Sequence, residues 1–173
     1  MSSAPFRVKV CGLTTLDNAR QVVSAGADAV GLNFCARSRR AIAPAVAAQI
    51  AAGLPAGVLR VGLFVDAPRE EIAARAADCR LNLIQLHGAE SPEFVAALRE
   101  LGPWPVMKAL ACGPGRADEV TQFVERCRAL GAPLAAVLLD ADVAGQTGGT
   151  GRVADWPTAA GLAACAELPP VVL

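Results

Sequence analysis

Short runs of aliphatic and β-branched residues alternate along this chain with longer, alanine-rich stretches. This alternation is typical of repeated strand–helix units around a parallel sheet. The apolar runs predict strands near 7–11, 28–34, 58–65, 82–87, 105–110, 134–140 and 170–173, with six helices between them. The sequence therefore predicts six strand–helix units and a seventh strand, within a single domain that covers residues 1–173.

Alternate positions within these strands carry two kinds of side chain. One parity is apolar and is expected to pack against the helices; it contains Val8, Val10, Val30, Leu32, Val61, Leu63 and Val65. The other parity is too polar for a dry interface between helix and sheet; it contains Lys9, Cys11, Gly31, Asn33, Arg60, Gly62, Gln85, His87 and Lys108. These residues are expected to point into a barrel. An open, doubly wound sheet would usually be apolar on both faces, so the pattern favours an α/β fold of the (β/α)8 barrel type.

Composition and charge narrow the class of protein. With 54% apolar residues, the 173-residue chain can bury one substantial core. Its sixteen acidic and sixteen basic side chains balance, so a broad basic surface for nucleic acid is not expected. The longest apolar runs are far shorter than a membrane span, and residues 1–7 lack the apolar stretch of a signal peptide. A cytoplasmic protein with no nucleic-acid or membrane partner is expected.

The six cysteines form no CxxC pair, and only one histidine is present to complete a metal site. Neither disulfides nor a metal centre are predicted, and most of the cysteines are expected to be small buried hydrophobic residues. In a barrel of this type the active site is built where the strands end, so strand-end residues are the candidates for chemistry. They are Cys11, Asn33, the segment 37–40, Asp66, His87, Asp140 and the glycine-rich loop 145–151.

Each candidate has a chemical and a structural interpretation. Cys11 is either a base or nucleophile, if cationic neighbours favour its thiolate, or a buried structural thiol. Asp140 ends an apolar strand, where a carboxyl group can donate a proton, but it also suits a helix N-cap. His87 either transfers protons or only shapes the pocket. Segment 37–40 contains three arginines that either grip an anion or are simply solvated.

The glycine-rich loop matches neither the phosphate-binding GxxxxGK[ST] motif nor a dinucleotide-binding GxGxxG motif in its strand–turn–helix setting. It is interpreted instead as a flap that can approach a ligand closely. No nucleotide or other cofactor is predicted from it.

Motifs at four strand ends together resemble the phosphoribosylanthranilate isomerase family. They are Lys9-Val10-Cys11-Gly12-Leu13-Thr14, Ser38-x-Arg40, Gln85-Leu86-His87-Gly88, and Leu138-Leu139-Asp140 followed by Gly148-Gly149-Thr150-Gly151. Their order and spacing fit throughout, and the resemblance covers essentially all 173 residues.

The resemblance implies an isomerase of tryptophan biosynthesis that works without a cofactor on a small phosphorylated substrate. It implies that Asp140 is the general acid, that Cys11 is the general base and that Arg40 holds the anthranilate carboxylate. His87 would line the pocket, and Gly148 and Gly149 would contact the substrate. The protein would be a monomer or a homodimer.

The sequence departs from the family pattern at its end, because strand seven is followed by no further strand. Family members continue through a glycine-bearing loop, an eighth strand and a final helix, which usually help to bind phosphate. The barrel is therefore expected to lack its last strand and helix. An inactive barrel fragment that acts only with a partner segment is one alternative. Indole-glycerol-phosphate synthase is another; it needs a catalytic lysine, for which only Lys9 and Lys108 are available.

Overall fold

The computed structural model describes residues 4–141 and 155–173. Within them the chain forms seven parallel strands: β1 (Lys9–Cys11), β2 (Ala29–Asn33), β3 (Leu59–Phe64), β4 (Leu83–Leu86), β5 (Val106–Cys112), β6 (Ala136–Ala141) and β7 (Val171–Val172). The helices that alternate with them are α1 (Leu16–Ser24), α2 (Pro44–Gly53), α3 (Arg69–Asp78), α4 (Pro92–Leu101), α5 (Ala117–Ala129) and α6 (Trp156–Ala164). The predicted order of strands and helices is confirmed.

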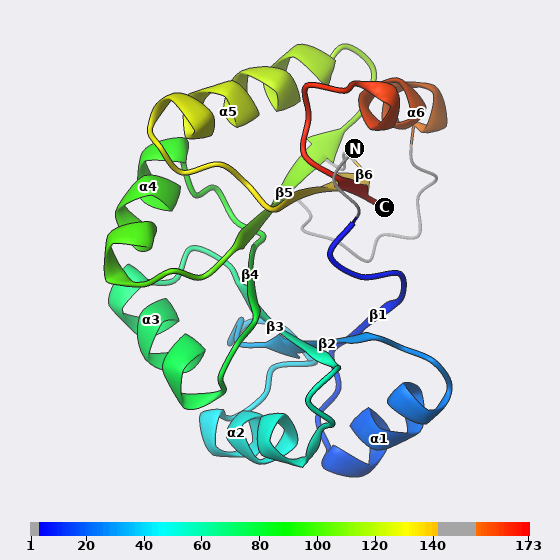
Figure 1. Ribbon diagram of the computed structural model, residues 1–173, viewed down its shortest axis with the longest axis vertical. Helices are drawn as coiled ribbons and strands as arrows, with labels where there is room; N and C mark the ends of the chain where they lie inside the picture. Colours follow the sequence, from blue (N-terminus) through cyan, green and yellow to red (C-terminus); the bar gives the residue numbers. More distant parts are fainter. Residues whose placement is uncertain (1–3, 142–154) are drawn as a thin grey trace.

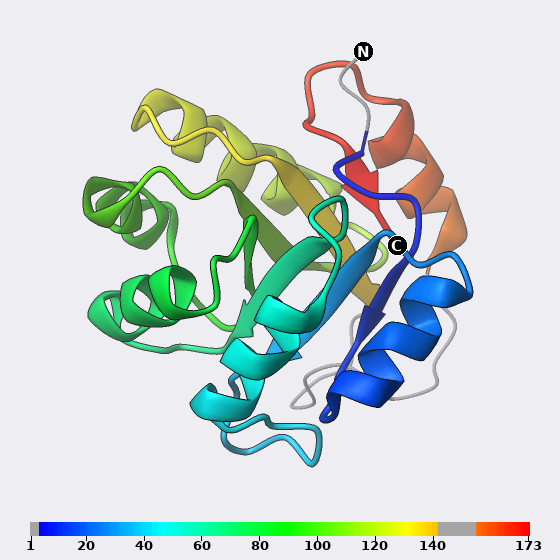
Figure 2. The same ribbon diagram turned by 60° about the horizontal axis from the view of Figure 1, so that its bottom comes forward.

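Each strand pairs with the next one along the chain, which gives a seven-stranded sheet of order β1 to β7. The sheet curls into part of a barrel, and the helices cover its outer side (Figures 1 and 2). The predicted (β/α)8-type fold is confirmed. Within the described part of the chain, β1 and β7 are the two edge strands of the sheet. No helix of this part is both long and apolar enough to cross a membrane.

Alternate strand residues contribute to two separate apolar layers. The layer between sheet and helices includes Val30, Leu32, Ile84, Leu86, Val137 and Leu139, which pack with helix residues such as Ile50, Ile72, Val95 and Val120. The layer inside the barrel consists of Phe6, Ala29, Val61, Leu83, Met107 and Ala136. The inner layer lies toward the amino ends of the strands, so the polar inward residues are left near the carboxyl ends.

The predicted orientation of β3 was wrong. Val61 packs inside the barrel and Leu63 lines its cavity, whereas Arg60 and Phe64 face the helices. Arg60 is tolerated there because its guanidinium group satisfies backbone carbonyls at the end of α2. Its Nε donates to the Ala51 carbonyl at 2.8 Å, and Nη2 donates to the Leu54 carbonyl at 3.2 Å. A charged residue in a strand therefore did not indicate the inner face.

Lys108 was also predicted to face the barrel, and this prediction was wrong for a similar reason. It pairs in register with Leu86 and Val137, which belong to the layer between sheet and helices. Its ammonium group lies 3.1 Å from a Glu90 carboxylate oxygen, and both side chains are almost fully buried. The ion pair replaces the water that an isolated buried charge would need.

Side-chain caps fix where helices begin above the rim of the barrel. The Thr15 hydroxyl accepts a hydrogen bond from the Asn18 N–H at 3.2 Å, and Ser91 does the same for Phe94 at 3.2 Å. Each cap satisfies an N–H group that the first helical turn leaves without a partner. At the opposite end of the barrel, Asp28 accepts hydrogen bonds from the backbone N–H groups of Arg7 and Val8, which lower the pKa of its carboxyl group.

Candidate active site

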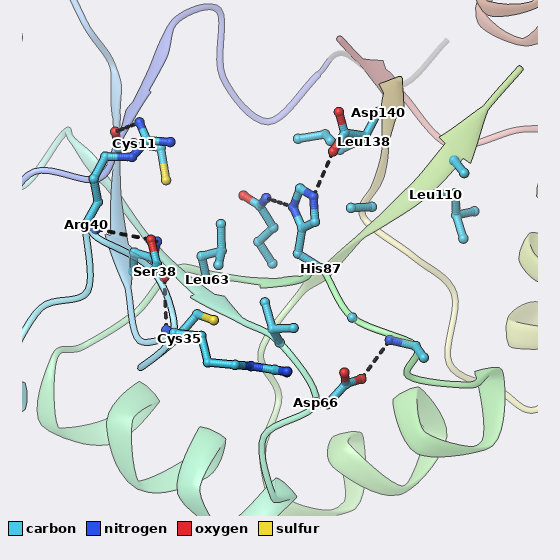
Figure 3. A pocket seen from close by; sticks show the side chains of 18 of the residues that line it. Cys11, Cys35, Ser38, Arg40, Leu63, Asp66, His87, Leu110, Leu138 and Asp140 are labelled. Carbon is cyan, nitrogen blue, oxygen red and sulfur yellow. Dashed lines mark hydrogen bonds and ion pairs between the residues drawn. The ribbon is translucent and has the colours of Figure 1, made fainter. Parts of the chain in front are cut away.

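A cavity of about 1130 Å³ opens at the carboxyl ends of the strands (Figure 3). Four predicted site residues line it: Cys11, Arg40, His87 and Asp140. The candidates Asn33 and Asp66 line it as well. Gly148 and Gly149, which were predicted to contact the substrate, lie outside the described residues.

A chain of hydrogen bonds connects three side chains on one side of the cavity. The Gln85 amide nitrogen lies 3.0 Å from His87 Nδ1, and His87 Nε2 lies 3.0 Å from Asp140 Oδ2 (Figure 3). Gln85 is buried, with only 2% of its surface exposed. The side chains of His87 and Asp140 are 17% and 30% exposed. The chain therefore runs from the interior of the protein to a carboxyl group that a ligand can reach.

The sequence explains this arrangement locally. Gln85 and His87 are two residues apart at the end of β4, so their side chains lie on the same face of the sheet. Asp140 lies on β6, with β5 in between. There β5 places Ala109 and Ala111 in the cavity wall, and Ala111 pairs in register with Asp140. Because these two side chains are small, His87 can reach across β5 to Asp140.

The buried Lys108–Glu90 pair holds the backbone around His87. The Lys108 ammonium group donates to the Gly88 carbonyl at 2.7 Å. Glu90 accepts hydrogen bonds from the backbone N–H groups of Gly88 and Asp66, each at 2.9 Å. The loops that follow β3 and β4 are thereby tied together, and the segment that carries His87 is fixed from behind.

Cys11 lies on the opposite side of the cavity from Asp140 (Figure 3). It pairs in register with Gly31 on β2, and a Cβ atom at Gly31 would lie only 2.6 Å from the Cys11 Sγ. Gly12 follows with a φ of +82°, and a Cβ atom there would lie 2.5 Å from Cδ of Arg40. The thiol and the arginine thus occupy space that side chains at these two positions would fill.

The loop after β2 carries Arg40 to the rim of the cavity. The Asn33 amide donates to the Ser38 hydroxyl at 3.0 Å, and that hydroxyl accepts the Arg40 backbone N–H at 3.1 Å. Arg37 and Arg39 line the cavity from the same loop. The cationic rim is suited to an anionic ligand, since guanidinium groups bind carboxylate and phosphate through paired hydrogen bonds.

Gln85 was not singled out as a site residue from the sequence, although it was placed on the inner face. Its spacing of two residues from His87 was the signal that would have identified it. Asp66 accepts the Ala89 N–H at 2.7 Å, which adds a second connection between the loops after β3 and β4. No group of three His, Cys, Asp or Glu residues suited to a metal ion occurs in ranges 4–141 and 155–173.

The remaining cysteines divide into two groups. Cys79, Cys112 and Cys127 are buried, as predicted for most of the thiols, and burial raises the pKa of each. For Cys127 the pKa rises to about 11. Cys35 lines the cavity, and Cys165 is partly exposed away from it.

The fold and the cavity define a (β/α)8-type barrel protein whose site lies at the strand ends. In this site the Cys11 thiol lies across the cavity from the hydrogen-bonded carboxyl group of Asp140. A family model for N-(5'-phosphoribosyl)anthranilate (PRA) isomerase matches residues 8–167. The chain belongs to this family. A relative named N-(5'-phosphoribosyl)anthranilate isomerase from Desulforudis audaxviator is 46% identical over 149 residues, which are 86% of this chain and 68% of the relative.

Solved structures agree with this assignment. The crystal structure of phosphoribosyl anthranilate isomerase from Thermotoga maritima is 34% identical, with a TM-score of 0.82 over 97% of this chain and 76% of that one. A second structure is a phosphoribosyl anthranilate isomerase in complex with reduced 1-(o-carboxyphenylamino)-1-deoxyribulose 5-phosphate. It is 36% identical, with a TM-score of 0.69 over 79% of this chain and 66% of that one. A third describes monomers made from the dimeric Thermotoga maritima enzyme, at 31% identity, with a TM-score of 0.77 over 97% of this chain and 74% of that one.

Proposed function

We propose that this chain catalyses the Amadori rearrangement of N-(5-phosphoribosyl)anthranilate to 1-(2-carboxyphenylamino)-1-deoxyribulose 5-phosphate in tryptophan biosynthesis. Membership of the family supports the reaction. The observation that carries the proposal is the placement of Cys11 and Asp140 on opposite sides of one cavity, because the reaction needs an acid and a base at different atoms of one substrate.

Asp140 is the proposed general acid. Its carboxyl group gives a proton to the furanose ring oxygen, and the bond between that oxygen and C1 breaks. The lone pair of the anthranilate nitrogen forms the new C1–N double bond, so the ring opens to a protonated Schiff base. Asp140 is left as a carboxylate that accepts a hydrogen bond at Oδ2 from His87, which lies 3.0 Å away.

Cys11 is the proposed general base. As a thiolate it removes the proton from C2, and the electrons of that C–H bond neutralise the iminium group to give an enamine. The enamine is also an enol at C2, and proton transfer converts it to the keto product. The absence of a side chain at Gly31 gives the Cys11 thiol its place in the cavity wall.

Arg40 is the proposed partner of the anthranilate carboxylate, since its guanidinium group lies on the Cys11 side of the cavity rim. His87 contributes as a lining residue that is hydrogen-bonded to the acid. Gly148 and Gly149 are proposed to contact the substrate from the glycine-rich loop. The other arginines of the rim, Arg37 and Arg39, are suited to the negative charge of a phosphorylated sugar.

The wider biochemical setting of the proposed enzyme follows from the chemistry of its reaction. The rearrangement only redistributes protons and electron pairs within one molecule, so it requires no redox cofactor. A cytoplasmic location suits a biosynthetic enzyme, and no nucleic-acid partner is proposed. A monomer or a homodimer remains the expected state, and the Thermotoga maritima relative is described as dimeric. That residues 1–173 form a single (β/α)8-barrel domain stays a prediction.

Turnover of purified protein with N-(5-phosphoribosyl)anthranilate tests the function, with substrate and product separated by chromatography. Product formation above the uncatalysed rate is expected. A folded protein that binds the substrate without converting it would favour the barrel fragment that acts only with a partner. Conversion of the keto product onward to an indole would instead favour the synthase. The synthase needs a catalytic lysine: Lys108 is buried against Glu90 behind the sheet, which leaves Lys9, in the cavity wall, as the one candidate.

A further inference from the structure

The hydrogen-bond chain behind the acid has a direction that the atoms at its ends determine. A primary amide nitrogen only donates hydrogen bonds, so the Gln85 Nε2, at 3.0 Å, requires His87 Nδ1 to be the acceptor. A neutral imidazole carries its single proton on the other nitrogen, Nε2. That N–H then points at Asp140 Oδ2, 3.0 Å away.

We infer that Gln85 is a positioning residue that holds His87 in the Nε2–H tautomer, so that the imidazole donates a hydrogen bond to Asp140. This inference rests on the proposed function, in which Asp140 is the acid. A proton on Nδ1 would face the N–H of Gln85 at 3.0 Å, so this contact favours the tautomer that carries its proton on Nε2. Without Gln85, either ring nitrogen could carry the proton, and the imidazole would not be fixed as a donor to Asp140.

The surroundings of Gln85 favour a role in the site over a role in stability. The residue is 2% exposed, and its carbonyl oxygen is buried with no hydrogen-bond partner among the described residues. Such an oxygen destabilises a fold, and an apolar side chain of similar shape would avoid the penalty. Among the described residues, the one polar contact of the Gln85 side chain is the one to His87.

The neighbouring charged groups do not replace this contact. Lys108 and Glu90 neutralise each other at 3.1 Å, and Lys108 is directed to the helix side of the sheet. Their contacts fix the backbone at Gly88 and Asp66, not the imidazole ring. Ring protonation is therefore decided by Gln85 at one nitrogen and Asp140 at the other.

The sequence allows a direct test, because His87 is the only histidine in the chain. In tag-free protein labelled with 15N-histidine, one imidazole gives all the side-chain signals, and these distinguish protonated from unprotonated ring nitrogens. At about pH 8, where a neutral imidazole is the reference state, the wild-type protein is expected to show Nε2 protonated and Nδ1 unprotonated. Protonation of Nδ1 in the wild-type protein would overturn the inference.

Two substitutions make the test independent of folding losses. Gln85→Glu places a carboxylate that accepts a hydrogen bond from Nδ1–H, so protonation of Nδ1 is expected. Gln85→Met removes the donor at similar volume, so a mixture of tautomers is expected at unchanged or higher thermal stability. Gln122→Glu, on the exposed surface of α5, adds the same charge as a control and should leave the spectrum unchanged. Spectra of both Gln85 variants that match the wild type would also overturn the inference.

Kinetics then connect the tautomer to the reaction. Gln85→Glu is expected to lower kcat by about tenfold or more and to change KM by less than about threefold, since a proton-transfer group and not a binding contact is altered. The kcat of Gln85→Met should lie between those of the wild type and Gln85→Glu. Equal kcat in all three would overturn the link to catalysis. Wild-type protein with the expected tautomer but no turnover would instead refute the proposed function and leave the tautomer assignment supported.

Discussion

The two sides of the cavity hold their reactive groups in different ways. On the side of β4 and β6, Asp140 is held through hydrogen bonds to His87 and, behind it, Gln85. On the side of β1 and β2, no hydrogen bond to the Cys11 thiol occurs among the described residues, and Gly31 lies directly against the sulfur. One group is positioned by directional bonds and the other by shape.

This difference suits the two proposed tasks. A proton donor needs a defined protonation state, which hydrogen-bond partners impose. A thiolate that removes a proton from carbon needs an approach unobstructed by other donors, because a hydrogen-bonded sulfur is a weaker base. The Asp140 side should therefore be sensitive to changes of hydrogen-bonding character at constant volume, and the Cys11 side to changes of volume.

The largest effect is expected from Cys11→Ser. The hydroxyl has nearly the same shape but is far too weakly acidic to supply the anion, so kcat should fall by about 10²–10⁴-fold, the usual contribution of a general base. Steady-state turnover measures the loss, and Cys165→Ser, at a partly exposed thiol outside the cavity, is the matched control. Retention of more than about a tenth of the rate would refute the role of Cys11 as base.

Asp140→Asn should lower kcat by about 10²-fold or more, a loss similar to that expected for Cys11→Ser. The amide keeps the volume of the carboxyl group, and its oxygen still accepts the hydrogen bond from His87, but the transferable proton is lost. Circular dichroism and thermal unfolding should show a folded protein. If turnover is unchanged, the acid is another group and the two sides of the cavity do not differ in the way described.

Much of the fold was predictable because it depends on patterns that are local in sequence. Strand and helix order followed from the alternation of apolar runs, and the strand-end position of Cys11, His87 and Asp140 followed from those strands. The orientations of Arg60 and Lys108 were not predictable in this way. Each is stabilised on the helix side by a partner distant in sequence. Arg60 bonds to Ala51, nine residues away, and Lys108 to Glu90, eighteen residues away.

The contacts within the site show the same limit. The adjacency of Gln85 and His87 is encoded by their spacing along one strand, and it could have been found. The contact between His87 and Asp140 spans 53 residues and depends on the curvature of the sheet and on the small side chains of β5 between them. Hydrophobic periodicity in the sequence does not predict a side-chain contact that reaches across a neighbouring strand.

Arg40→Ala tests binding on the Cys11 side. A charge-assisted hydrogen bond contributes about 1.5–3 kcal/mol, so KM should rise by roughly 10- to 100-fold while kcat changes less. Arg20→Ala, which removes one exposed positive charge from α1, controls for the change in net charge. A fall in kcat at constant KM would contradict a carboxylate-binding role for Arg40.

Gly31→Ala tests whether shape alone positions the thiol. The added methyl group would lie 2.6 Å from the Cys11 sulfur, so the sulfur must move. Because small displacements of reacting groups are costly, kcat should fall by about tenfold. Gly57→Ala is the control, since its added methyl group meets nothing within 4 Å. Equal kcat in Gly31→Ala and the wild type would show that the Cys11 side tolerates changes in volume.

The smallest perturbation is alkylation of the protein without any substitution. It compares the reactivity of the thiols in the cavity with that of the thiols buried behind the sheet. Burial raises the pKa of Cys127 to about 11, so the protonated form dominates at lower pH and the reactive thiolate is rare. At about pH 8 only roughly one Cys127 thiol in a thousand is ionised. The rate of Cys127 labelling should rise about tenfold per pH unit until the pH approaches the pKa of about 11.

Peptide mass mapping after iodoacetamide treatment locates the modified thiols. Cys11, Cys35 and Cys165 should be modified first, and Cys79, Cys112 and Cys127 only on unfolding. A product analogue should then protect Cys11 and leave Cys165 reactive. Early modification of Cys127 would contradict the raised pKa of its buried thiol. No protection of Cys11 would show that the thiol proposed as the base is not exposed to the ligand in the cavity.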